Sequence, residues 1–324
     1  MPAKIEREGV ISVFDFFQMF PDEDSAREYI EKIRWEDGVC CPHCGCGGVT
    51  KRKRVPKRRR VTKLKRKGYY YCRWCKERFT VRTGTVFQRS HIPLNKWLYA
   101  IFVLETSRKG ISSIQLAKEV GITQKSAWFM LHRLREGCDV EVAPLNGEVE
   151  IDETWIGGRK NRMHYAKKKK LPPGPYGGKV PVLGLRERES GRVIAYPVEN
   201  VGIDTLTVNV LANVEEGSTV YTDDHQGYNR LGKWYEHLSV NHTGWQFADG
   251  DITTNRIESI WAVVKRAYKG VYHYMSPKHL ERYISEFVFR LNAGGDEVPI
   301  MRRMEMLLQG AFDRHITYDE LIAD

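Results

Sequence analysis

Two Cys-x-x-Cys pairs in the first quarter of the chain most strongly constrain its fold. They are Cys41-Pro-His-Cys44 and Cys72-Arg-Trp-Cys75. One turn can present both thiolates of a pair, and two such turns complete the tetrahedral four-sulfur shell that structural Zn²⁺ prefers. The pattern therefore predicts a zinc ribbon with these four cysteines as ligands. A ribbon of this size has little core, so the metal would hold it together.

The other cysteines argue against a disulfide scaffold. The chain has seven cysteines, an odd number, and its first residues lack a signal-peptide layout. Cys40 and Cys46 flank the first pair and are interpreted as spare, although either could replace a neighbour as a zinc ligand. No segment approaches the ~20 apolar residues that span a bilayer, so we expect no membrane partner.

A strongly basic segment, residues 51–67, separates the two cysteine pairs. It holds 12 Lys or Arg among 17 residues and no acid. The whole chain has a net charge of +11, so the remaining residues carry only −1 and the basicity lies in this one segment. Such a concentration of charge favours a polyanionic partner. We predict that the segment forms an elongated hairpin or loop projecting from the ribbon.

Helical patterns flank the ribbon. Residues 22–35 have an acidic first turn and apolar residues at helical spacing, and residues 93–106 are apolar enough for a buried helix. The pattern of residues 110–137 predicts a helix capped by Ser112 or Ser113, a glycine turn at Gly121 and a second helix capped by Thr123. This order is a helix-turn-helix layout.

Two interpretations of this helix pair stay open. In the first it contacts DNA, and Lys125, Ser126 and Arg133 lie on or near its second, recognition helix. In the second it is a plain helical hairpin that serves packing or dimerisation.

From about residue 147 the pattern changes to strands. Val149 and Ile151 alternate with Glu150 and Asp152, which is typical of a half-buried strand. The order that follows is two more strands, a helix, a strand, a helix, a strand and two closing helices. This order favours a mixed sheet with flanking helices, the ribonuclease-H-like plan, so the chain as a whole is multidomain and combines α+β and α/β architecture.

The predicted organisation has five parts. They are an N-terminal helical segment (1–37), the zinc ribbon with its basic hairpin (38–90), the helix-turn-helix region (91–140), a ribonuclease-H-like catalytic domain (147–292) and a C-terminal helical tail (293–324).

Three acidic residues of the predicted sheet domain suit phosphodiester cleavage by two Mg²⁺ ions, which needs several carboxylates converging on one point. Asp152 lies in the first strand and faces away from Val149 and Ile151. Asp223 ends an apolar strand, where a strand opens into a loop. Glu258 lies on the first of the closing helices. Strand ends and a nearby helix can bring such ligands together.

Residues near these acids have possible roles of their own. Lys265 lies seven residues after Glu258, two helical turns or ~10 Å further along the same helix, where it could hold a DNA phosphate. Asn255 precedes Glu258 by about one turn and is a rival or additional ligand. Glu153 and Asp224 adjoin the two strand aspartates and are alternative ligands.

The sequence resembles bacterial insertion-sequence transposases that have a zinc-ribbon N-terminal domain and an ISXO-like DDE catalytic domain. The resemblance extends over about residues 20–292. The stretches that carry it are WEDGVCCPHC, YYYCRWCKERFTVRTGTVFQRSHIPLNKWLYAIF, VEIDETWIGG, VYTDDHQGY and TNRIESIWAVVKRAYKGVYHYMSPKHLERYISEFVFRLN.

The resemblance implies a DNA transposase that binds element terminal repeats, cleaves phosphodiester bonds with Mg²⁺ or Mn²⁺, and joins 3′-OH ends to target DNA. It assigns the catalytic acids to Asp152 and Asp223, with Glu258 or Asn255 as the third residue. The implied partners are double-stranded DNA and further copies of the chain, because two ends must be paired. The implied location is the bacterial cytoplasm, in association with the nucleoid.

Two other functions remain open from the sequence. A domesticated, catalytically inactive transposase would use the zinc ribbon and the helix-turn-helix only to bind DNA as a regulator. A ribonuclease-H-like nuclease, such as a junction resolvase, would cut branched DNA without joining strands.

Overall fold

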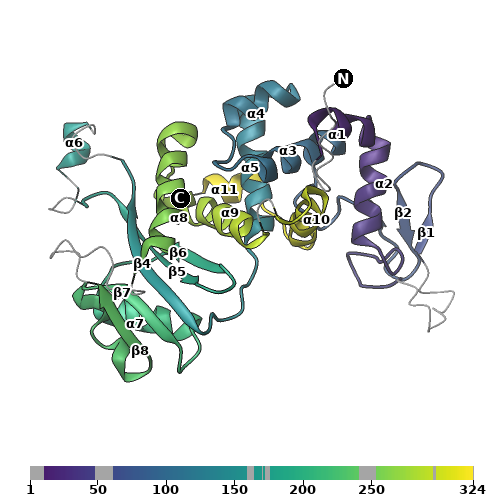
Figure 1. The fold of residues 1–324 in the computed structure, drawn as a ribbon. Coiled ribbons are helices and arrows are strands. Elements are labelled where there is room, and N and C mark those ends of the chain that lie inside the picture. The colour runs from purple at the N-terminus through teal and green to yellow at the C-terminus, as the bar shows by residue number, and fades with distance from the viewer. Residues whose placement is uncertain are drawn as a thin grey trace, which may run out of the picture. The chain divides into compact units, whose positions relative to one another are not determined.

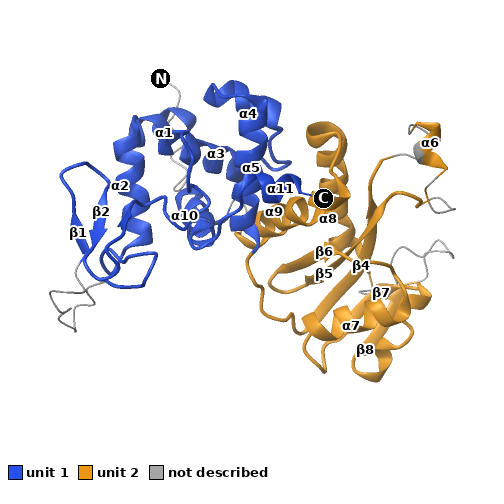
Figure 2. Ribbon diagram, turned by 180° about the vertical axis from the view of Figure 1, so that it is seen from behind, with its two compact units in different colours: residues 1–139, 296–324 blue, residues 140–295 orange. Residues whose placement is uncertain are grey.

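The computed structural model describes residues 11–47, 61–158, 164–169, 171, 176–240, 253–294 and 297–323. The chain divides into two compact units, residues 1–139 with 296–324 and residues 140–295 (Figure 2). None of the helices described is both long and apolar enough to cross a membrane. Most of the basic segment, residues 51–60, lies outside the described residues, so the predicted elongated hairpin stays a prediction.

The first unit combines a small sheet with a group of helices (Figure 1). Its helices are α1 (Val13–Met19), α2 (Glu23–Arg34), α3 (Leu94–Thr106), α4 (Ser113–Val120), α5 (Gln124–Cys138), α10 (Ile300–Ala311) and α11 (Tyr318–Ile322). Its three strands form one antiparallel sheet: β1 (Val61–Lys63), β2 (Tyr70–Cys72) and β3 (Arg78–Phe79). The buried helix α3 packs against α2 and α10, and α10 also packs against α5.

The sequence predicted the helix-turn-helix region from its caps, and α4 and α5 confirm them. The Ser112 side chain accepts a hydrogen bond from the amide of Gln115 at the start of α4. Gly121 ends α4 in the left-handed conformation, at φ +64°. The Thr123 hydroxyl accepts from the amide of Ser126 and so caps α5.

Arg133 lies on α5 as expected, but it is buried and so is not on the exposed face of that helix. Its Nη2 donates to the carbonyl of Gln88 over 2.6 Å, and its guanidinium lies over the rings of Trp97 and Phe129. Arg133 therefore lies on the predicted second helix, but its side chain packs inside the first unit. Lys125, in contrast, is exposed.

The second unit is a five-stranded mixed sheet with helices on both faces. Its strands are β4 (Glu148–Ile156), β5 (Val180–Glu187), β6 (Val193–Pro197), β7 (Thr219–Asp223) and β8 (Glu236–Val240), in the order β6-β5-β4-β7-β8. The first three are antiparallel, whereas β4, β7 and β8 run parallel. Its helices are α6 (Tyr165–Lys168), α7 (Ile203–Asn213), α8 (Asn255–Ala267) and α9 (Leu280–Asn292).

This strand and helix order confirms the predicted fold class of a mixed sheet with flanking helices. It differs at one point. Between β7 and β8, where the sequence predicted a helix, the described chain has two short 3₁₀ helices, Gln226–Tyr228 and Leu231–Lys233. The domain boundaries predicted within the two units stay predictions.

The sheet separates two apolar cores, and the alternation of β4 assigns its residues to them. Val149 and Ile151 pack in the core that includes α7, whereas Ile156 packs in the core that includes α8 and α9. Figure 1 shows α7 on one side of the sheet and α8 and α9 on the other. Because successive strand residues face opposite sides, Glu150 and Asp152 lie on the α8 side.

Helix α8 approaches the sheet most closely at Gly184 of β5. A Cβ at this position would lie 2.3 Å from Cζ2 of Trp261 and 3.1 Å from Cδ1 of Ile257, both on α8. Only glycine allows α8 this close to the strand beside Asp152.

We predict that Gly184→Ala lowers the free energy of unfolding by about 1–3 kcal/mol, because the added methyl group displaces Trp261. Denaturant unfolding measures this change. The control is Gly232→Ala, since a Cβ at exposed Gly232 meets no atom within 4 Å. Equal stabilities of the two variants would contradict the prediction.

Candidate functional site

Four cysteine sulfurs lie together in the first unit. The Sγ atoms of Cys41, Cys44, Cys72 and Cys75 all lie within 4.8 Å of one another. The Cys41–Cys75 and Cys44–Cys72 sulfurs are each 3.6 Å apart. Thiolates bound to one Zn²⁺ at about 2.3 Å would lie roughly 3.8 Å apart, whereas a disulfide needs about 2.05 Å. The four residues therefore fit structural Zn²⁺.

The two cysteine pairs lie on turns of the same shape. The amide of Gly45 donates to the carbonyl of Cys41, and the amide of Lys76 donates to the carbonyl of Cys72, both over 2.9 Å. Gly45 and Lys76 both have positive φ angles, +67° and +62°. Each turn thus ends in a left-handed residue that directs both thiolates of a pair to one point. Two turns of the same conformation therefore present the four sulfurs to one point.

The two remaining cysteines of this region do not belong to the four-sulfur cluster. Cys40 directs its thiol to the carbonyl of Gly45, at 3.2 Å. The carbonyl of Cys46 accepts from the amide of Cys41 over 2.8 Å. Their placement agrees with the interpretation that both are spare.

A second group of candidate side chains lies where β7 ends, beside the middle of β4. The ladder of these parallel strands pairs Val149 with Val220 and Glu150 with Tyr221. The same register, continued by two residues, sets Asp152 opposite Asp223. Neighbouring strands lie about 4.8 Å apart, and side chains two residues apart share a face. Both aspartates therefore face the α8 side of the sheet.

The carboxylates of this end of the sheet act on one another. Burial, together with the charges of Glu153, Asp223 and Glu258, raises the pKa of Asp152 to about 7. The first turn of α8 carries Glu258, which is exposed. The structure thus brings together Asp152, Asp223 and Glu258, the three acids singled out in the sequence. Carboxylate oxygens are the ligands that Mg²⁺ and Mn²⁺ favour, and a bound cation would relieve their repulsion.

Asn255 and Lys265 also lie on α8. Asn255 is its exposed first residue, and its amide donates to the Thr253 hydroxyl over 3.1 Å. Lys265 is exposed two helical turns beyond Glu258. The Glu258 carboxylate accepts from the Thr254 hydroxyl over 3.1 Å.

Glu153 and two residues after β7 extend the acidic group. The Tyr228 hydroxyl donates to Glu153 Oε2 over 2.6 Å, and the amide of His225 donates to Asp223 Oδ1 over 3.1 Å. Burial raises the pKa of Glu153, and the Asp223 charge adds to the effect. Sequence reasoning missed Tyr228 and His225, although both follow the strand-end aspartate within five residues.

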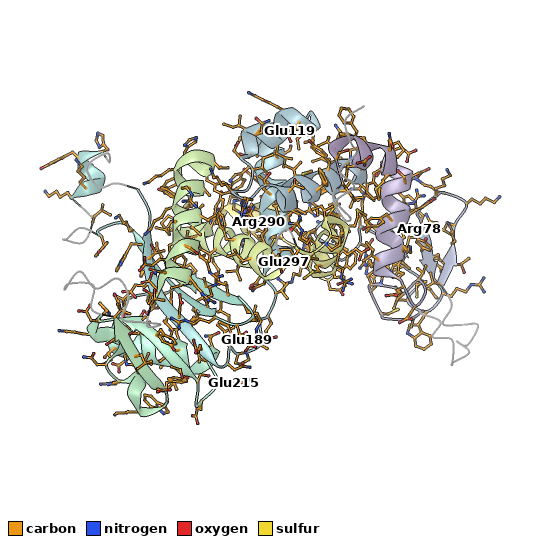
Figure 3. The ribbon with its side chains drawn as sticks, in the orientation of Figure 1. Arg78, Glu119, Glu189, Glu215, Arg290 and Glu297 are labelled. Carbon is orange, nitrogen blue, oxygen red and sulfur yellow. The ribbon has the colours of Figure 1, made fainter. Side chains whose placement is uncertain are left out.

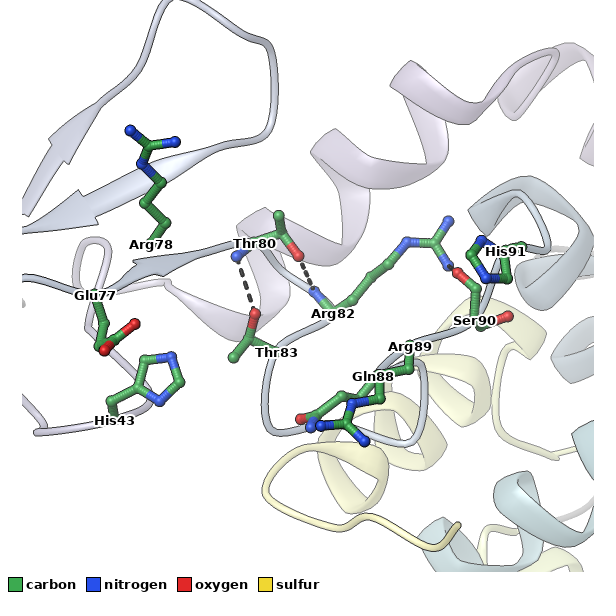
Figure 4. A pocket seen from close by; sticks show the side chains of 10 residues that line it. All are labelled: His43, Glu77, Arg78, Thr80, Arg82, Thr83, Gln88, Arg89, Ser90 and His91. Carbon is green, nitrogen blue, oxygen red and sulfur yellow. Dashed lines mark hydrogen bonds between the residues drawn. The ribbon is translucent and has the colours of Figure 1, made fainter. Parts of the chain in front are cut away.

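The first unit also has a cavity of about 570 Å³ beside the zinc ribbon (Figure 4). Its lining contains three arginines, two histidines and one glutamate. The lining residues are His43, Glu77, Arg78, Thr80, Arg82, Thr83, Gln88, Arg89, Ser90 and His91. Arg82 is held internally, because its Nη1 donates to the carbonyls of Ser90 and Ile92. Arg78 and Arg89 are exposed and give the cavity a basic mouth.

Two family models match segments of the chain, one in each unit. Residues 144–292 match the family model of the ISXO2-like transposase domain, and residues 21–78 match that of the transposase zinc-ribbon domain. Each match covers less than half of the chain and shows the domain that its segment is similar to. The acidic group lies in the first of these domains, and the four-cysteine cluster lies in the second.

One curated relative covers most of the chain. It is an uncharacterized protein in transposable element ISH50 of Halobacterium salinarum, 27% identical over 282 residues, which are 84% of this chain and 91% of the relative. The predicted bacterial origin stays a prediction.

Two solved structures show weak similarity. One is a simian T-cell lymphotropic virus intasome in complex with PP2A regulatory subunit B56 gamma, with a TM-score of 0.28, 13% identity and coverage of 54% of this chain and 63% of that chain. The other is a pre-cleavage Mos1 transpososome, with a TM-score of 0.26, 13% identity and coverage of 62% and 74%. Similarity at these TM-scores carries no inference about this chain.

We predict that Cys41→Ser and Cys72→Ser release zinc and unfold the ribbon, because each removes one of four ligands. Cys40→Ser is the matched control and should retain the metal. Metal content of the purified proteins, measured by plasma mass spectrometry, checks the prediction. Zinc loss in Cys40→Ser alone would instead assign the ligand role to Cys40.

We predict that, without added metal, Asp152→Asn raises the free energy of unfolding of the protein relative to wild type, and that this difference grows as the pH rises. The folded-state pKa of Asp152, about 7, exceeds its ordinary value, so ionisation destabilises the wild type between about pH 4 and pH 7. At 1.36 kcal/mol per pKa unit, the difference in the free energy of unfolding should reach about 4 kcal/mol above pH 7. Urea unfolding without added Mg²⁺ at pH 5.5 and 7.5 measures the difference between variant and wild type. A difference independent of pH would contradict the prediction.

Proposed function

We propose that this chain is an active DDE-type transposase. It binds the terminal repeats of its element as double-stranded DNA, cleaves phosphodiester bonds there, and joins the 3′-OH ends to target DNA. The observation that carries this proposal is the placement of Asp152 of β4 and Asp223 of β7 on one face of a mixed sheet, beside α8, in a segment similar to an ISXO2-like transposase domain. Side chains from three elements converge there, which is the arrangement that a ribonuclease-H-like catalytic domain needs.

Asp152, Asp223 and Glu258 would hold Mg²⁺ or Mn²⁺. Two such ions, when bound, activate an attacking oxygen and stabilise a leaving one. The proximity of Glu258 to Asp152 favours Glu258 over Asn255 as the third acidic position. An amide can supply an oxygen ligand, but it adds no negative charge to balance the cation.

Other residues of the chain would orient the DNA. Lys265 lies two turns from Glu258 on α8, where its ammonium can pair with a phosphate that flanks the scissile bond. Tyr228 holds the Glu153 carboxylate over 2.6 Å and so fixes the residue next to Asp152. Hydrolysis at the element end leaves a 3′-OH, which then attacks a phosphodiester of the target DNA in the same site.

The first unit would recognise the element ends. Its exposed cations include Arg78 and Arg89 at the mouth of the cavity and Lys125 at the start of α5. Such cations pair with phosphates without reading sequence. Two element ends must be joined in one event, so we propose that two or more copies assemble on DNA. The cytoplasmic, nucleoid-associated location belongs to the same proposal.

We predict that Asp152→Asn, Asp223→Asn and Glu258→Gln each abolish strand transfer but leave binding to element ends nearly intact, whereas Asn255→Ala retains transfer. The assay uses the flanking DNA ends, a plasmid target and Mg²⁺ or Mn²⁺. The control is Glu215→Gln. Glu215, labelled in Figure 3, is exposed and precedes β7, at the end of that strand opposite Asp223.

Each outcome of this assay separates the candidate functions. Products that vanish in the acid variants support the transposase. End binding without cleavage by the wild type, at any metal concentration, would instead support the DNA-binding regulator. Cleavage of branched DNA without joining would support the resolvase-like nuclease. Transfer that survives Glu258→Gln but not Asn255→Ala would reassign the third residue.

A further inference from the structure

The first turn of α8 carries Glu258 but is not capped by its own N-cap residue. Thr254 occupies the N-cap position, and its side chain makes no capping hydrogen bond to the helix amides. Its hydroxyl donates to Glu258 Oε1 instead. The first amides of a helix have no partner within the helix. The start of α8 therefore depends on acceptors from other parts of the unit.

Glu150 of β4 supplies these acceptors. Its Oε2 accepts from the amides of Arg256 and Ile257, each over 3.0 Å. The side chain is fully buried, with an exposed fraction of 0%. Its negative charge also interacts favourably with the positive end of the helix dipole. A residue of the central strand thus caps the helix that carries Glu258.

Arg188, directly after β5, balances this buried charge. Its Nε donates to Glu150 Oε1 over 2.9 Å, and its Nη2 donates to the carbonyl of Thr253 over 2.7 Å. Its guanidinium lies over the ring of Tyr221, 3.6 Å from the ring centroid. Tyr221 is the β7 residue that pairs with Glu150 in the parallel ladder. One arginine therefore connects β4, β7 and the residues that lead into α8.

These contacts link the two ends of the acidic site. Glu150 precedes Asp152 by two residues and shares its face of β4. The amides that Glu150 binds belong to the two residues directly before Glu258. The hydrogen bonds therefore tie the start of α8 to the strand that carries Asp152.

We propose that Glu150, held by Arg188, is a positioning residue that sets the placement of the Glu258 carboxylate relative to Asp152, and through it the affinity of the site for a divalent cation. The inference rests on the proposed function, because it takes Asp152 and Glu258 as metal ligands. It gives Glu150 no contact with the metal or with DNA.

A purely structural role is the alternative. Both roles predict that a change of Glu150 lowers the stability of the second unit. Only the positioning role predicts that cation binding weakens beyond the effect of changing an equally buried carboxylate elsewhere in the sheet. Glu187 provides that comparison. It is 4% exposed, and its carboxylate accepts from Arg192 Nη2 over 2.7 Å and from the amide of Asn146 over 2.9 Å, rather than from α8.

The test compares Glu150→Gln with Glu187→Gln in the full-length, zinc-loaded protein. Glutamine keeps the size of the side chain but replaces one acceptor oxygen by a donor, so one set of donors loses its partner. Mn²⁺ titration followed by electron paramagnetic resonance gives the dissociation constant. Mn²⁺ binding that Asp152→Asn abolishes is assigned to the acidic site. Hydrogen exchange reports on the amides of Arg256 and Ile257.

We expect Glu150→Gln to raise the Mn²⁺ dissociation constant about 10- to 100-fold, the effect of losing a residue that orients a metal ligand. The amides of Arg256 and Ile257 should exchange at least about tenfold faster, because they lose a charged acceptor. Glu187→Gln should leave both quantities nearly unchanged. Arg188→Lys keeps the charge but loses the planar fork, so it should change both quantities in the same direction as Glu150→Gln. If Glu150→Gln does not fold, Arg188→Lys tests the inference in its place.

Equal Mn²⁺ dissociation constants for Glu150→Gln and Glu187→Gln would overturn the inference. Faster exchange at α8 with unchanged Mn²⁺ binding would overturn it as well, since Glu150 would then only cap the helix. A wild type that binds no Mn²⁺ at the acidic site would do the same.

The proposed function fails in a different way. A wild type that binds Mn²⁺ but transfers no strands would contradict the transposase, while the comparison of dissociation constants would still decide the role of Glu150. Strand transfer by the wild type, with equal Mn²⁺ requirements in both glutamine variants, would contradict the positioning role alone.

Discussion

The parallel pairing of β4 with β7 is the constraint on which the acidic site depends. One register places Glu150 beside Tyr221 and, two residues further, Asp152 beside Asp223. The same face of β4 therefore carries the carboxylate that caps α8 and the carboxylate that meets Asp223. A slip of one residue would turn Asp152 into the apolar core of Val149 and Ile151. The two apolar cores on either side of the sheet hold this register.

Asp152 differs from the other buried carboxylates of the second unit in the charge of its neighbours. Buried carboxylates elsewhere have cationic partners: Glu187 pairs with Arg192, Glu286 with Arg290 and Glu150 with Arg188. Where β7 ends beside the middle of β4, the neighbours of Asp152 are carboxylates, and its pKa rises to about 7. Perturbed titration of this kind is typical of functional sites. The fold thus tolerates repulsion at the place where a cation would bind.

Local signals in the sequence were sufficient for most helices and strands, although not for the 3₁₀ helices between β7 and β8. Ser112, Gly121 and Thr123 mark the helix-turn-helix caps because a cap acts within three residues of itself. The two-residue spacing within each cysteine pair likewise predicts a turn. The alternation of β4 places Asp152 on the face of the sheet opposite Val149 and Ile151, as the structure has it. Which carboxylates bind a metal stays a prediction.

Long-range contacts could not be read in this way. Glu150 looks like one polar position of an alternating strand, and its partners, the α8 amides, lie more than 100 residues away. Arg133 has the spacing of an exposed helix residue, yet Trp97 and Gln88 from an earlier segment cover it. Tyr228 gives no sign in the sequence that its hydroxyl reaches back to Glu153.

The path of the chain through its two units has a consequence for biosynthesis. Helix α10 packs against α2, α3 and α5, and the Arg303 guanidinium donates to the carbonyl of Glu105 in the core of the first unit. Residues 296–323 therefore complete a unit that begins almost 300 residues earlier. On the ribosome, the sheet of the second unit has emerged in full before α10 is translated. The sheet of the second unit can thus form first, whereas the packing of α2, α3 and α5 is completed only after α10 has been translated.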